Sequence, residues 1–73
     1  MNINVLHDLI KTKSNLTIYM NGHVDPFNVD RNTHKPVIDM KRKTLTIGIP
    51  SYCYTRMFII DVGSITHVEY AKY

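Results

Sequence analysis

Three stretches rich in β-forming residues, all within residues 44–70, constrain the fold of this chain more than any other feature. Residues 44–49 alternate strictly, with aliphatic side chains on one face and threonine or glycine on the other. Residues 56–62 predict a second strand. Its run 57–60 is apolar on both faces, which is typical of a strand that is central in the fold or covered from outside. A last strand is predicted over 65–70, after the Gly63-Ser64 turn.

The N-terminal segment predicts a helix. Residues 4–13 place apolar side chains at helical spacing after Asn4, a typical N-cap residue. A helix of about three turns is not stable alone in water. It must therefore lay its stripe of Leu6, Leu9 and Ile10 on a sheet.

A strand and a turn follow this helix. Residues 16–20 alternate between apolar and polar side chains, and Asn21-Gly22 is the strongest short-range signal for a hairpin with a type I′ turn. Pro26 cannot donate a ladder hydrogen bond, so residues 23–30 are predicted as a bulged strand or an edge strand. Residues 31–36 are polar and predict a loop.

The whole chain predicts one mainly β domain. Its 73 residues allow a single domain over 1–73, with a helix over 4–13 and a β meander over 16–70, including a short strand at 37–40. So many short antiparallel strands in so small a chain predict a strongly bent antiparallel barrel of roughly five to six strands, of the Sm/SH3-like kind.

Size and cysteine content limit how such a domain is stabilised. A domain this small buries only roughly 60% of its unfolded surface, and the single cysteine, Cys53, excludes an internal disulfide. We therefore expect a face to be covered in a homo-oligomer or on a partner. The lone cysteine, the lack of a signal-peptide pattern and the lack of an apolar run of about 20 residues favour a cytoplasmic protein that does not enter a membrane.

Two motifs resemble those of a known family. In one family of small β proteins, an N-terminal helix is followed by a V-x-I-x-L strand that ends in Asn-Gly. Residues 16–22 (LTIYMNG) are similar to this strand, and residues 65–68 (ITHV) are similar to the family's final strand, which has an I-S/T-x-V pattern. In this respect the chain resembles the Sm-like (Hfq-type) fold. The RNA-contacting Tyr-Lys-His stretch of that family would fall on residues 60–62 (IDV), which carry neither its positive charge nor its aromatic ring. The resemblance thus implies a barrel that oligomerises through strand edges more than it implies RNA binding.

Metal and catalytic chemistry have little support in the sequence. His23, Asp25, Asp30 and His34 lie close together in the chain, but none of them has the spacing typical of zinc sites, so exposed loop histidines are the simpler interpretation. Cys53 has no neighbour that would lower a thiol pKa, and a buried or half-buried structural role is expected for it. Paired carboxylates, a phosphate loop and a nucleophile elbow are all missing. The sequence predicts a non-enzyme without a cofactor.

A basic and aromatic set is the first candidate for a working surface. The net charge is +3, and cations with aromatic rings are what proteins use to bind phosphates and bases of single strands. RNA is the expected nucleic acid. The alternative interpretation is a solvated basic turn with tyrosines packed at a barrel rim. The predicted nucleic-acid-binding residues are Lys35, Lys41, Arg42, Lys43, Tyr52, Tyr54 and Arg56.

An apolar set is the second candidate. Met57, Phe58, Ile59 and Ile60 place apolar side chains on both faces of one strand, which favours an interface. A phage-type module that docks on a host protein by this face or by a strand edge fits this pattern. An oligomer that sequesters a small ligand between subunits is a further alternative.

Overall fold

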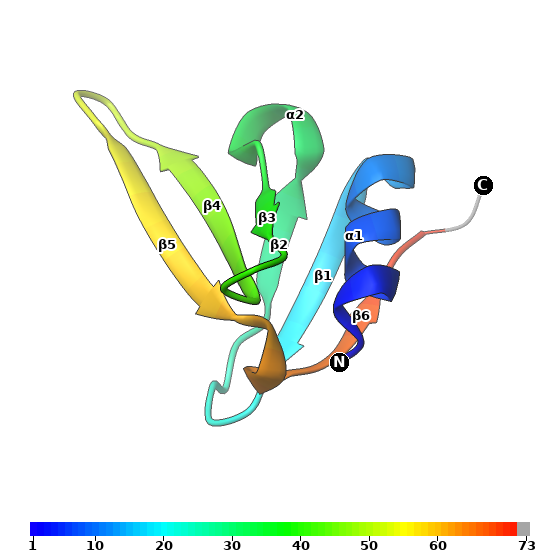
Figure 1. Ribbon diagram of the computed structural model, residues 1–73. Helices are drawn as coiled ribbons and strands as arrows, with labels where there is room; N and C mark the ends of the chain where they lie inside the picture. Colours follow the sequence, from blue (N-terminus) through cyan, green and yellow to red (C-terminus); the bar gives the residue numbers. More distant parts are fainter. Residues whose placement is uncertain (72–73) are drawn as a thin grey trace.

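The structure, a computed structural model, describes residues 1–71 (Figure 1). The strands form two three-stranded antiparallel sheets with the orders β2-β1-β6 and β3-β4-β5. The predicted mainly β fold with an N-terminal helix is confirmed at this level. The elements in chain order are α1 (Ile3–Thr12), β1 (Asn15–Met20), β2 (Phe27–Asp30), α2 (Arg31–His34), β3 (Val37–Asp39), β4 (Thr44–Pro50), β5 (Thr55–Asp61), the 3-10 turn η1 (Val62–Ser64) and β6 (Ile65–Glu69).

One core joins α1 to both sheets. The predicted alternation in β1 and β4 is confirmed, because the aliphatic side chains of both strands point into this core and Ile49 alone among them is only partly buried. The helix contributes the stripe predicted for it, although Leu9 is only half-buried. The buried core residues are Leu6, Ile10, Leu16, Ile18, Met20, Val29, Leu45, Ile47, Ile60, Val62 and Ile65.

The helix α1 begins at Ile3, one residue before the predicted start at residue 4. Asn2, not Asn4, is the N-cap, because the Asn2 side-chain oxygen accepts a hydrogen bond from the Asn4 N–H at 2.9 Å. The helix ends where the Lys13 N–H donates to the Leu9 carbonyl at 2.9 Å. No helix of the described residues is long and apolar enough to cross a membrane.

The connection between β1 and β2 is longer than the predicted two-residue hairpin. Gly22 has a φ of +84°, but Asn21 does not have a positive φ, and the His23 N–H donates to the Met20 carbonyl at 3.3 Å. A positive φ at the third turn position alone is typical of a type II turn, so the type I′ prediction was wrong. Pro26 lies just before β2, which is an edge strand of its sheet, one of the two options predicted for it.

A short helix replaces part of the predicted polar loop at 31–36. The Asp30 carboxylate caps α2 by accepting hydrogen bonds from the backbone N–H groups of Asn32 (2.8 Å) and Thr33 (3.2 Å). The His34 ring nitrogen Nδ1 accepts from the Asp30 N–H at 2.8 Å. Lys35 ends the helix in the left-handed conformation, with a φ of 44°. An aspartate before three polar residues is a capping signal, and it explains why this segment is ordered.

Candidate functional site

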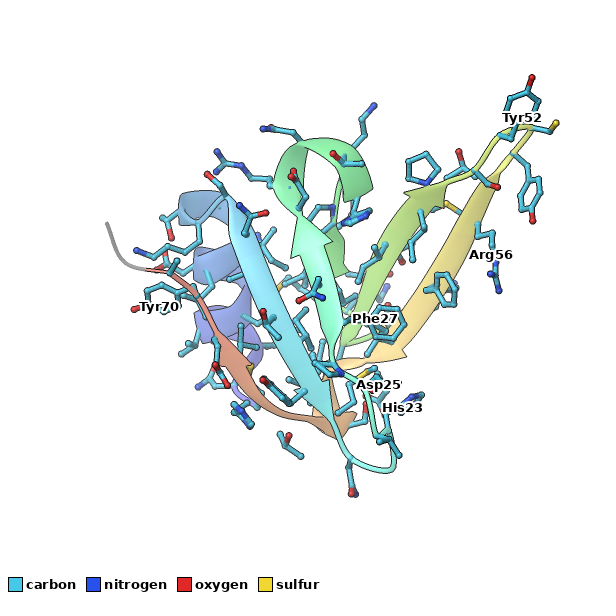
Figure 2. The ribbon with its side chains drawn as sticks, turned by 180° about the vertical axis from the view of Figure 1, so that it is seen from behind. His23, Asp25, Phe27, Tyr52, Arg56 and Tyr70 are labelled. Atoms are coloured by element: carbon cyan, nitrogen blue, oxygen red, sulfur yellow. The ribbon has the colours of Figure 1, made fainter. Side chains whose placement is uncertain are left out.

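The β4–β5 hairpin is the part of the molecule that extends furthest from the core. In Figure 1 it leans away from α1 and β1, and in Figure 2 its end carries Tyr52 far from the labelled His23, Phe27 and Tyr70. Seven residues of each strand pair, from Thr44 with Asp61 to Pro50 with Thr55. Among the strands of the described residues, β5 has β4 as its only neighbour and forms one edge of its sheet. The two views agree that no element of the described chain is drawn along the other side of β5.

Two backbone bonds at the ends of the hairpin determine which side of β5 each peptide group faces. The Ser51 N–H donates to the Tyr54 carbonyl at 2.8 Å, and the Val62 N–H donates to the Lys43 carbonyl at 3.0 Å. In an antiparallel ladder, residues that exchange hydrogen bonds alternate with residues that do not. With the observed register, the even-numbered residues of β5 bond to β4.

The odd-numbered residues of β5 therefore direct their N–H and C=O groups to the open side of the strand. These residues are Thr55, Met57, Ile59 and Asp61, and together they define what we call the β5 edge. Two of them are large apolar side chains that remain in water, since Met57 is 62% exposed and Ile59 is 73% exposed. The Asp61 carbonyl accepts a hydrogen bond from the Ser64 hydroxyl at 2.7 Å. At Met57 and Ile59, the β5 edge combines exposed apolar side chains with backbone groups that have no strand partner among residues 1–71.

The two faces of β5 have different environments. Ile60 is buried in the core, and Phe58 packs edge-on against Phe27, with ring centroids 5.5 Å apart and an interplanar angle of 61°. The Arg56 guanidinium lies 5.3 Å from the centroid of the Phe58 ring, within the range of a cation–π contact. Of the predicted apolar interface, Met57 and Ile59 lie on the outer face, whereas Phe58 and Ile60 lie on the inner face.

A hollow of about 270 Å³ lies beside the inner face of β5, next to the β1–β2 connection. Phe27, Phe58 and Ile60 contribute to its lining, and His23 and Asp61 supply its ionisable groups. Ile59 also lines this hollow, so the hollow reaches the β5 edge.

The hairpin separates the predicted basic and aromatic residues. Lys41, Arg42 and Lys43 form a turn before β4, which we call the basic turn; the N–H groups of Lys41 and Arg42 both donate to Asp39 Oδ1 at 3.0 Å. The hairpin tip, residues 51–54, lies at the other end of β4, where Tyr52 is fully exposed and Tyr54 is 62% exposed. A strand of seven residues is roughly 20 Å long, so one chain does not bring the two groups together.

The two remaining basic residues of the set lie on opposite faces of the hairpin. Lys35 lines a second hollow with Pro50, Thr55 and Met57, on the outer face of the hairpin. Arg56 lies on the inner face, over the Phe58 ring.

The residues weighed for metal binding lie in two places. His23 and Asp25 are exposed in the β1–β2 connection (Figure 2), whereas Asp30 and His34 are engaged in the cap of α2. Within residues 1–71, no group of three or more His, Cys, Asp or Glu side chains is arranged to hold a metal ion. Cys53 is exposed at the hairpin tip, so the prediction that it is buried or half-buried was wrong. A cysteine between two tyrosines in a tight turn has no core side chain near it to pack against.

A stacked polar cluster on β1 and β6 was not predicted. Tyr19 and His67 are cross-strand partners, and their rings stack with centroids 4.1 Å apart. His67 Nε2 lies 3.4 Å from Glu69 Oε1. The nearby Glu69 side chain raises the pKa of Tyr19, because it favours the protonated hydroxyl. The alternation of β1 placed Tyr19 on the outer face, but only the strand register shows which residue of β6 lies opposite.

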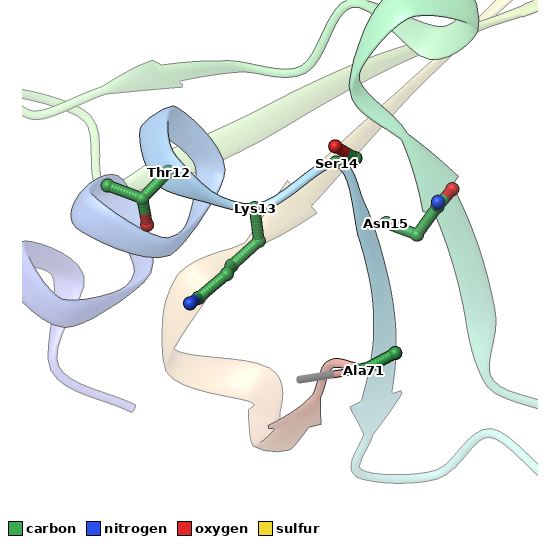
Figure 3. Close-up of a pocket in the computed structure, with 5 residues that line it drawn as sticks. All are labelled: Thr12, Lys13, Ser14, Asn15 and Ala71. Carbon is green, nitrogen blue, oxygen red and sulfur yellow. The ribbon is translucent and has the colours of Figure 1, made fainter. Parts of the chain in front are cut away.

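A further hollow, of about 240 Å³, lies where α1 passes into β1 (Figure 3). Thr12, Lys13, Ser14, Asn15 and Ala71 line it, and Figure 3 shows these side chains around the junction. They offer hydroxyl, amide and ammonium groups. None of these described lining residues is a carboxylate, an imidazole or a thiol.

Comparison with known proteins gives no relative to extend these observations. No family model, no curated protein and no solved structure matches the chain.

Proposed function

We propose that this protein is a non-catalytic binding protein that docks on another protein chain by adding a strand at the β5 edge. One observation carries this proposal: the N–H and C=O groups of Met57 and Ile59 have no strand partner within residues 1–71, and their side chains are exposed. Strand addition uses such backbone groups for affinity and alternate side chains for specificity.

The composition of β5 supports this role. Proteins usually protect an exposed edge with lysine, proline, a bulge or a very short strand. β5 has seven residues, contains neither lysine nor proline, and pairs with β4 without a register shift. Its two charged residues, Arg56 and Asp61, lie near the ends of the strand and leave the middle of the edge apolar. An apolar edge of this length is a liability for a protein that works alone, and a binding surface for one that does not.

The strand order is also compatible with the Sm/SH3-like barrel. In such a barrel one strongly bent strand runs from one sheet into the other. Here β2 is an edge strand of the sheet β2-β1-β6, and β3 is an edge strand of the sheet β3-β4-β5. The short helix α2 connects these two strands in the chain. We propose that β2 and β3 together correspond to that bent strand, interrupted by α2, and that η1 corresponds to the short turn before the final strand.

Binding of single-stranded RNA is a second candidate function. It is favoured by the hairpin tip, where Tyr52 is fully exposed and has no core contact that would explain an aromatic residue there. Rings of this kind stack with bases, and nearby cations bind phosphates. Replacing Lys41, Arg42 and Lys43 with Glu should remove this binding, and wild-type binding should weaken steeply with salt. Lack of binding to any RNA at low salt would eliminate this candidate.

The experiment for strand addition is affinity capture with a tagged protein. The prey is a bacterial lysate mixed with a differently tagged second copy of the chain. The test variant carries Met57→Lys and Ile59→Lys together, because charged side chains at an edge oppose pairing. Val24→Lys is the control, since Val24 is 98% exposed and lies in the β1–β2 connection, outside every strand.

Wild type and Val24→Lys should retain a stoichiometric protein partner that the double variant loses. If the double variant retains the same partner, or if wild type captures neither a lysate protein nor the second copy, docking by the β5 edge is wrong.

A further inference from the structure

We infer that the chain on the β5 edge is a second copy of this protein, bound antiparallel about a two-fold axis at Phe58. This inference rests on the proposed function and names its partner. It is carried by the sequence of β5: when two copies of this strand run antiparallel, they place compatible residues opposite each other. Phe58 is the middle residue of the seven in β5, so a two-fold axis there pairs the strand over its whole length.

The direction of the backbone groups selects the register. Only the residues of the β5 edge can exchange hydrogen bonds with the partner, so each must lie opposite another of them. With the axis at Phe58, Met57 lies opposite Ile59 of the second copy, and Thr55 lies opposite Asp61. All four edge residues then lie opposite a partner, and each such pair can exchange two hydrogen bonds. The Asp61 carbonyl already accepts a hydrogen bond from the Ser64 hydroxyl at 2.7 Å. About six of the eight bonds between the copies therefore use backbone groups that are free in one chain.

Neighbouring registers are poorer. An axis at Met57 leaves Asp61 without a partner, and an axis at Ile59 places the Asp61 carboxylate opposite Met57. The register centred on Phe58 places apolar residues against apolar residues and a hydroxyl against a carboxylate. It also places no two like charges opposite each other, because Arg56 faces Ile60 of the second copy.

The side chains gain cover on both faces of the combined sheet. On the outer face, Met57 and Ile59 of both copies form one apolar group of four side chains, where a single chain leaves them 62% and 73% exposed. On the inner face, the two Phe58 residues form a non-hydrogen-bonded pair, the kind with the closer side chains. The result is a continuous six-stranded sheet with the order β3-β4-β5-β5-β4-β3.

This register has a consequence for the basic turn. It places Tyr54 of one copy opposite Val62 of the other, and Val62 is bonded to Lys43 in its own chain. Tyr54 is therefore two strand spacings, about 10 Å, from the Lys43 backbone of the second copy. The dimer brings together the hairpin tip and the basic turn that a single chain holds apart.

The first experiment measures mass and register. Sedimentation of the purified protein over roughly 1 μM to 1 mM should show a monomer–dimer equilibrium. The Met57→Lys, Ile59→Lys double variant should stay monomeric, and Val24→Lys should behave as wild type. In a Cys53→Ser background, Phe58→Cys should form an intermolecular disulfide on oxidation, because Cα atoms of a non-hydrogen-bonded pair lie about 4.5 Å apart.

Arg56→Cys in the same background is the matched control. The two Arg56 residues would be offset by four positions, about 13 Å along the strands, which is too far for a disulfide. A disulfide at Arg56→Cys but not at Phe58→Cys would contradict the register.

The second experiment does not depend on Phe58→Cys folding well. Amide hydrogen exchange of the wild type should show that the N–H groups of Phe58 and Ile60 are protected at every concentration, since they bond to β4. The N–H groups of Met57 and Ile59 should be protected only at concentrations where the dimer forms.

The outcomes separate the two proposals. A wild type that stays monomeric over the whole range, with Met57 and Ile59 amides always unprotected, overturns the dimer. If the same protein still captures a lysate partner that the double variant loses, strand addition at the β5 edge stands without self-pairing.

Discussion

Ile59 and Ile60 provide an internal comparison, because they are the same residue type, adjacent in one strand, on opposite faces. Ile60 is 6% exposed and Ile59 is 73% exposed. Replacing isoleucine with alanine removes three carbon atoms, so at about 0.8 kcal/mol per buried CH₂ the transfer loss at Ile60 is about 2.4 kcal/mol. The cavity left behind raises the expected cost of Ile60→Ala to about 3 kcal/mol.

The same change at Ile59 should cost much less in the monomer. Only about a quarter of the Ile59 side chain is covered, so the transfer loss is about 0.6 kcal/mol. Both variants lose the same strand propensity, which therefore cancels in the comparison. The free energies of unfolding of the two variants should differ by about 2 kcal/mol.

Urea unfolding at low protein concentration measures this difference. With a slope of about 1 kcal/mol per molar urea for so small a domain, the two midpoints should differ by about 2 M. If Ile60→Ala does not fold, Ile60→Val against Ile59→Val gives the same comparison at about 1 kcal/mol. Equal costs at the two positions would refute the assignment of the two faces of β5.

Three further predictions concern other parts of the molecule. Gly22→Ala should lower stability by about 1 kcal/mol in urea unfolding, because Gly22 has a φ of +84°, and Gly22→Asn should cost less; equal losses would contradict a conformational cause. Tyr19 should titrate above its ordinary pKa of 10.0 in ultraviolet absorbance, and Glu69→Gln should lower that pKa toward 10.0. Because the folded state holds this proton more tightly, its contribution to stability is present below pH 10 and lost as the pH rises above that value. Cys53 should react with a maleimide as fast in the dilute folded protein as in urea, and protection in the folded state would contradict its exposure at the hairpin tip.

The inward faces of β1 and β4 could be predicted because a period of two is a local property of the sequence. The capped helix α2 was not predicted, because the polar composition of residues 31–36 was interpreted as a loop. The local signal for it is Asp30, which accepts hydrogen bonds from the N–H groups of Asn32 and Thr33. The turn after β1 was not predicted correctly, because the path of its six-residue connection depends on how β2 pairs with β1. Which residue of β6 lies opposite Tyr19 likewise depends on a pairing between strands far apart in the sequence.

The candidate surface shows how far strand geometry alone goes. Lys43 and Tyr52 are separated by one complete strand, so their positions at opposite ends of the hairpin follow from its length. The assignment of Met57 and Ile59 to the free side of β5 needed more. It depends on whether the odd-numbered or the even-numbered residues of β5 form hydrogen bonds with β4, and the sequence contains no signal for that choice.

If the dimer exists and RNA is bound, binding should depend on the dimer, because only two copies place a tyrosine tip near a basic turn. The Phe58→Cys, Cys53→Ser protein allows a test in which the protein charge stays constant. Its oxidised form is a covalent dimer, and its reduced form at low concentration is a monomer. The oxidised form should bind single-stranded RNA more tightly and with a steeper salt dependence, since more phosphates contact one particle.

The reduced form is the control, because it shows whether the hairpin tip of a single chain binds RNA without a second copy. Equal affinity and equal salt dependence, per chain, would show that each hairpin binds RNA by itself and that the dimer does not create the site. Tighter binding of the oxidised form would show that strand addition and RNA binding are parts of one function, because pairing at the β5 edge would then assemble the surface that contacts the RNA.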